Sequence, residues 1–149
     1  MAWWNKLGEG IRVDATARAL AIETFTFANV VGGDVLITQI IGRFTVAVNA
    51  TTNLFLQFTP TVATATVTVL CTAIDVDTYG IGDVVTITGV PGNALLPAAR
   101  AGAVPGMTVP LIVPAGELES DSDAAPGTGT ILWSVWYIPL TDGAYVVGV

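Results

Sequence analysis

The chain of 149 residues contains no histidine and a single cysteine, and these two scarcities exclude most catalytic chemistry. Without histidine, neither a Ser-His-Asp triad nor a His–carboxylate acid–base pair can form, and most zinc sites lose a usual ligand. The lone Cys71 excludes an internal disulfide and any CxxC site. We therefore expect no enzyme activity, no cofactor and no bound metal.

Charge is also scarce, at 11% of residues where a typical soluble domain has about 25%. Five basic residues against twelve acidic ones give a net charge of −7. So few basic side chains argue against a surface that follows a phosphate backbone, and we expect no nucleic-acid partner.

Hydrophobic residues make up 52% of the chain, which is unusual for a protein with so few charges. Obligate subunit interfaces are more apolar than ordinary protein surface, so this composition predicts permanent association with other chains, first of all with itself. The alternative is a monomeric, unusually apolar β-domain whose threonine-rich face supplies the polarity.

A stretch of 31 residues without charge, 44–74, is long enough to cross a bilayer. It contains nine threonines, however, and it alternates between apolar and polar residues, as strands do. Residues 1–6 do not resemble the start of a signal peptide. We therefore expect a protein that is made in the cytoplasm and has no membrane partner.

The remaining patterns predict an all-β chain of eight or nine short strands. Residues 64–72 alternate strictly. Residues 109–113 are bounded by Pro110 and Pro114, which is typical of an edge strand, and residues 131–138 are apolar on both faces, as a central strand is. We expect a single β-sandwich over residues 18–149, with a jelly roll as one form it can take. Residues 1–17 are predicted to form an N-terminal arm.

Five apolar residues are candidates for subunit contacts. Trp3 and Trp4 in the arm are typical interface anchors, although one of them could pack on the protein's own body. Leu95 and Leu96 lie in a segment, 89–106, that is too apolar for a solvated loop and that a neighbouring subunit could cover. Trp136 lies opposite the core face of its strand, where it either completes the core or projects into a contact.

The acidic residues Glu117, Glu119, Asp121 and Asp123 are spaced by two, so they share one face if the segment is a strand. Such a cluster could hold calcium, but like charges at this spacing are more typical of a solvated edge that blocks unwanted strand pairing.

Two other constellations have both a functional and a structural interpretation. Asp75 and Asp77, with Asp83, could form a glycosidase-type carboxylate pair, although aspartates around a glycine turn are usually turn formers. Trp133, Trp136 and Tyr137 could form a carbohydrate platform, but alternation places Trp136 on the opposite face from the other two. We therefore expect these three aromatic residues to lie on the two faces of a core strand.

Four segments carry a resemblance to a known family. They are VLITQIIG (35–42), LCTAIDVD (70–77), VPLIVPAG (109–116) and WSVWYIPLTDGA (133–144). In this order the segments resemble small virion structural proteins of tailed bacteriophages, over about residues 18–147. The two tryptophans of the arm lie outside the resemblance.

The resemblance implies a capsid decoration, or cement, protein that is often trimeric and is added to the outer surface of the phage head. Its partners would be other copies of itself and the major capsid protein, and its location the virion. The alternative is a tail or fibre module that binds host glycans or receptors. A polysaccharide-cleaving enzyme is a third possibility, which would require the paired carboxylates to line a groove.

Overall fold

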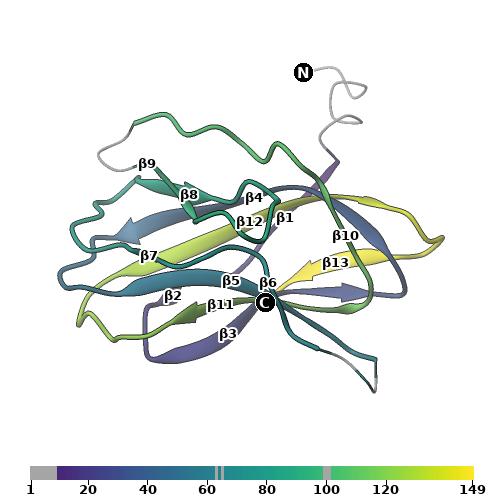
Figure 1. The fold of residues 1–149 in the computed structure, drawn as a ribbon, viewed down its shortest axis with the longest axis horizontal. Helices are drawn as coiled ribbons and strands as arrows, with labels where there is room; N and C mark the ends of the chain where they lie inside the picture. Colours follow the sequence, from purple (N-terminus) through teal and green to yellow (C-terminus); the bar gives the residue numbers. More distant parts are fainter. Residues whose placement is uncertain (1–9, 63, 65, 99–101) are drawn as a thin grey trace.

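The computed structural model describes residues 10–62, 64, 66–98 and 102–149. Two antiparallel sheets pack face to face, with β4 and β12 in the upper layer of Figure 1 and β3, β5 and β11 in the lower one. The predicted all-β sandwich is confirmed, whereas the jelly-roll topology stays a prediction. The described residues contain no helix, and therefore no helix that is long and apolar enough to cross a membrane.

The two sheets divide the strands as follows. The seven-stranded sheet consists of β1 (Ile11–Asp14), β2 (Arg18–Ala19), β4 (Val35–Val46), β8 (Val84–Thr86), β9 (Leu96–Ala98), β10 (Leu111–Val113) and β12 (Thr130–Pro139). The six-stranded sheet consists of β3 (Glu23–Val31), β5 (Asn53–Pro60), β6 (Thr68–Val69), β7 (Ile74–Asp75), β11 (Gly116–Ser122) and β13 (Tyr145–Gly148).

The longest ladder joins β12 to β4 and runs from Thr130 to Pro139 on β12. β12 also pairs with β1 on its other side, which confirms it as a central strand. β10 pairs with β4 alone among the described strands, as expected of an edge strand between prolines.

The core lies between the sheets and is built by alternate residues of the long strands. Ile131, Trp133, Val135 and Tyr137 of β12 point into it and are buried. Gly42 of β4 makes room for the indole of Trp133, because a Cβ at this position would lie 2.6 Å from its Cζ3 atom. The absence of a side chain at Gly42 therefore lets the Trp133 ring pack directly against the backbone of β4.

Residues 11–17, which were predicted to belong to the N-terminal arm, make contacts with both sheets. Ile11–Asp14 forms β1 and pairs with β12, and the next residues then join the two sheets. The amide of Ala15 donates to the carbonyl of Trp133 in one sheet, and the amide of Thr16 donates to the carbonyl of Val149 beside the other, both at 2.8 Å. Residues 11–17 thus belong to the sandwich, because their backbone hydrogen bonds are made within it.

One local prediction was wrong. Among the described residues of the alternating segment 64–72, only the two residues of β6 pair in a ladder. Residues 66–69 are all exposed, so little burial favours a longer strand there. In the apolar segment 89–106, Leu96–Ala98 forms β9, which pairs with β8.

Candidate functional surfaces

The acidic residues of β11 share one outward face, as their spacing predicted, but they do not mark an edge. β11 pairs with β3 on one side and β5 on the other, so it lies in the middle of the six-stranded sheet. The expectation of an edge strand failed because neighbouring strands supply donors that make a central position tolerable for carboxylates.

These donors hold three of the four carboxylates. Glu119, which is 9% exposed, accepts hydrogen bonds from Gln57 Nε2 at 2.8 Å and Thr59 Oγ1 at 2.7 Å. Asp121 accepts one from the hydroxyl of Thr24.

Asp123 accepts hydrogen bonds from both the amide nitrogen and the side chain of Asn53, at 2.8 and 2.7 Å. The bond from the Asn53 side chain is the main cause of a lowered Asp123 pKa. Across the described part of the chain, no three acidic or cysteine side chains come close enough together to hold a metal ion, so the calcium hypothesis gains no support.

Asp75 and Asp83 are engaged by backbone amides. Asp75 Oδ1 accepts hydrogen bonds from the amides of Thr52 at 3.1 Å and Asp77 at 2.9 Å, while Asp83 Oδ2 accepts one from Gly80 at 2.8 Å. These contacts are typical of carboxylates that stabilise turns. The pKa of Tyr79 is raised, first by burial and then by the charges of Asp83 and Asp75.

Cys71 is a buried core residue. Its Sγ accepts a hydrogen bond from the amide of Leu56 at 3.3 Å. Burial raises the pKa of the thiol to about 11, so almost none of it is the reactive thiolate at neutral pH.

The three aromatic residues of β12 do not form a platform. Trp133 and Tyr137 are buried in the core, while Trp136 lies half-buried on the outer face of the seven-stranded sheet. The guanidinium of Arg12 lies 5.2 Å from the Trp136 ring centroid and forms an ion pair with Asp14 at 2.8 Å. One face of the indole is therefore already occupied by this cation.

The other predicted interface residues have different positions. Trp3 and Trp4 lie outside the described residues. Leu95 is 1% exposed within its own chain, so no neighbouring subunit is needed to cover it. Leu96 is half-buried on β9, where it pairs with Thr86.

Met107, in the described segment between β9 and β10, contacts the protein's own sheet. The amide of Met107 donates to Gln39 Oε1 on β4 at 2.9 Å, and Met107 packs partly buried against the core. In Figure 1 the chain from residue 102 leads into β10. The sequence offered no signal for this contact, because Gln39 is an ordinary polar residue in a strand pattern.

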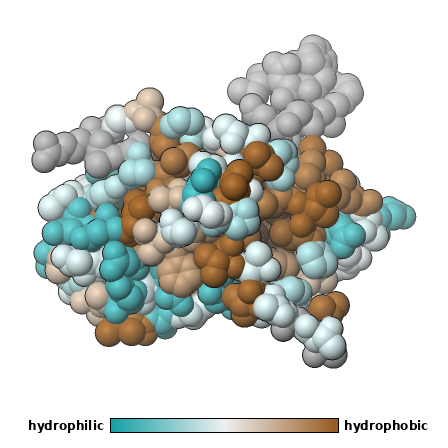
Figure 2. Space-filling model, in the orientation of Figure 1, coloured by the Kyte–Doolittle hydropathy of each residue, from teal (hydrophilic) through white to brown (hydrophobic). Residues whose placement is uncertain are grey.

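A row of aliphatic residues on the outer face of the seven-stranded sheet was not singled out from the sequence. Ile112 of β10 pairs with Leu36 of β4, which pairs in turn with Ile138 of β12. Ile112 is 69% exposed, and the other two are half-buried. We call these three residues the aliphatic row. Figure 2 shows brown, hydrophobic surface on the side where β10 and the adjoining ends of β4 and β12 lie.

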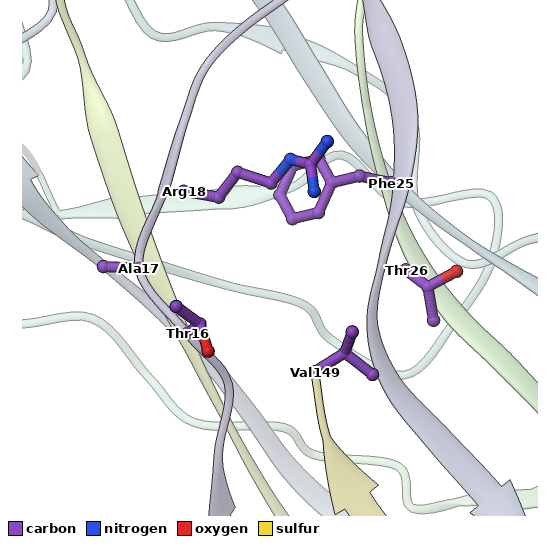
Figure 3. Close-up of a pocket in the computed structure, with 6 residues that line it drawn as sticks. All are labelled: Thr16, Ala17, Arg18, Phe25, Thr26 and Val149. Atoms are coloured by element: carbon purple, nitrogen blue, oxygen red, sulfur yellow. The ribbon is translucent and has the colours of Figure 1, made fainter.

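A pocket of about 140 Å³ opens where the chain passes between the sheets (Figure 3). Arg18 lies over the ring of Phe25, at 4.9 Å from its centroid, and forms an ion pair with Glu23 at 2.8 Å. The pocket is lined by Thr16, Ala17, Arg18, Phe25, Thr26 and Val149. It is smaller than the roughly 300–1,000 Å³ of most small-molecule sites. The guanidinium of Arg18 is also already paired with Glu23.

No protein-family model, curated protein or solved structure matches this chain.

Proposed function

We propose that this protein is a decoration, or cement, protein of a tailed-bacteriophage head. It self-associates, as a trimer, and binds the major capsid protein on the outer surface of the shell. The observation that carries the proposal is the aliphatic row, an apolar strip on the outer face of the β-sandwich in which Ile112 is exposed and the other two residues are half-buried. Exposed apolar patches of this kind typically mark protein interaction sites. The resemblance of four segments to phage virion proteins supports the proposal that this assembly forms on a phage head.

Such a role requires binding rather than chemistry. A ligand that binds the assembled shell and not its free subunits stabilises the shell by mass action, by about 2.7 kcal/mol per site at a free concentration 100 times the dissociation constant. The protein would be made in the host cytoplasm and act on the virion. The acidic outer face of β11 would then face solvent.

The test is to mix the purified protein with mature heads that lack it and to sediment the mixture. We expect co-sedimentation that saturates at many copies per particle, and a higher temperature for release of packaged DNA from decorated heads. Expanded and unexpanded heads prepared side by side test whether binding needs the mature lattice. Absence of binding to mature heads would overturn the proposal.

A tail or fibre module that binds host glycans is the alternative, and copy number separates the two. Quantitative gel analysis of purified virions should give a number of copies that scales with the capsomers of the head. A few copies per particle, together with binding to host cells or their polysaccharide, would favour the tail module instead.

A further inference from the structure

We infer that a second copy of this chain docks face-on against the outer face of the seven-stranded sheet, centred on the aliphatic row. The inference rests on the self-association in the proposed function, but not on binding to a shell. It assigns that self-association to named residues.

The geometry of the row suits a subunit contact. Ile112, Leu36 and Ile138 are directly paired across three adjacent strands, so their side chains stand side by side on one face. Trp136 follows on the same face of β12, two residues from Ile138. Aromatic and aliphatic side chains clustered on a rigid surface are typical of the central part of an interface.

The distribution of charge favours a second copy as the occupant. Each copy carries a net charge of −7, so two copies repel each other unless they meet through faces without excess negative charge. The outer face of the seven-stranded sheet carries Arg12, Asp14 and Arg43, which sum to +1.

The outer face of the six-stranded sheet has the opposite sign. Glu117, Glu119 and Asp121 sum to −3 there, and its strands contain no lysine or arginine. Arg43 makes no ion pair with any residue that the structure describes, so its positive charge is not neutralised within that part of the chain. The seven-stranded sheet is therefore the face on which copies of this acidic protein repel each other least.

The edge of the sheet is less suited to the contact than its face. β10 is three residues long and lies between Pro110 and Pro114, neither of which has an amide hydrogen to offer an added strand. The copies therefore meet through side chains on the face and not by extending the sheet across β10.

The experiment measures molar mass by light scattering across a range of protein concentrations. The wild-type protein should form oligomers, and Ile112→Asp should weaken their association by at least about tenfold. Ile112→Lys should also weaken it, although it lowers the net negative charge, because the contact is apolar. Ile81→Asp is the matched control: Ile81 is 75% exposed in the turn before β8, and its substitution should leave association unchanged.

Circular dichroism and thermal unfolding of each variant establish that it is folded. A monomeric wild-type protein, or an Ile112→Asp variant that associates as well as Ile81→Asp, would overturn the inference. If both Ile112 variants stay oligomeric but lose binding to heads, the row contacts the shell and the assignment to self-association is wrong. Because wild-type binding to heads is measured separately, failure of shell binding is distinguished from failure of this contact.

Discussion

The indole of Trp133 stacks on the ring of Phe27 with their centroids 5.2 Å apart and an angle of 25° between the ring planes. Trp133 belongs to β12 and Phe27 to β3, so this pair joins the two sheets at the centre of the sandwich. Each residue is 1% exposed.

Phe27→Ala should therefore lower the free energy of unfolding by about 3–5 kcal/mol, because it removes a buried ring and leaves a cavity beside Trp133. Denaturant unfolding, followed by tryptophan fluorescence at one fixed protein concentration, measures the change. Tyr145→Ala, on the exposed face of edge strand β13, is the control and should cost far less. Equal losses in the two variants would contradict the central role of the stacked pair.

Gly42→Ala should destabilise the fold by about 1–3 kcal/mol, because the added methyl group overlaps the Trp133 ring and the end of Ile131. Gly92→Ala is a matched control, since a Cβ at Gly92 meets no atom within 4 Å. The same unfolding experiment compares the two variants. If Gly42→Ala is no less stable than Gly92→Ala, the ring does not require the space that this glycine leaves.

The strands that could be predicted from the sequence are those whose residue pattern reflects their position in the sheet. Residues 131–138 are apolar on both faces, and β12 is indeed central. The prolines at 110 and 114 limited β10 to an edge. The alternation at 64–72 was misleading because an alternating pattern indicates only that a strand can form. The β6 ladder with β5 contains just two residues of this segment.

The position of β11 depends on contacts that a linear pattern does not contain. Four acidic residues in one segment suggest repulsion, but Glu119 and Asp121 are held by hydroxyl and amide donors from strands more than 50 residues away. Leu95 was misplaced for a similar reason, because its cover comes from its own chain. The aliphatic row was missed because it combines one residue from each of three strands and becomes visible only with the register.

Trp3 and Trp4 lie outside the described residues, and their prediction follows from residue type alone. If they anchor the protein to its partners, Trp3→Ala or Trp4→Ala should each weaken binding to heads by on the order of thirtyfold, which corresponds to about 2 kcal/mol. Co-sedimentation with undecorated heads measures the affinity. Asn5→Ala in the same segment is the control, and equal affinities for all three variants would remove the anchor role.

Cys71 should be unreactive in the folded protein. Its pKa of about 11 leaves almost no thiolate at pH 8, and the side chain is buried. A colourimetric thiol reagent should therefore react slowly in buffer and rapidly, with one equivalent, in denaturant. Rapid reaction without denaturant would show that the core around Leu56 opens easily.

Ser134 should set the acid titration of Asp14. Its hydroxyl donates to Asp14 Oδ1 at 2.6 Å, and this bond is the main cause of a lowered Asp14 pKa, with Arg12 contributing in the same direction. A carboxyl whose pKa is lower in the folded state stabilises the protein above its unfolded pKa, which is about 3.9 for aspartate. That stabilisation is lost as the pH falls through the lower, folded value.

Ser134→Ala should consequently raise the pKa of Asp14 toward its ordinary value and move this loss of stability to higher pH. NMR titration of the aspartate carboxyl carbons measures the midpoint directly. Asp123 serves as an internal control, because its lowered pKa comes from Asn53 and should not respond to the substitution. An unchanged Asp14 midpoint in Ser134→Ala would mean that Arg12 holds this carboxylate, so the ion pair beside Trp136 would be the stronger contact on this face.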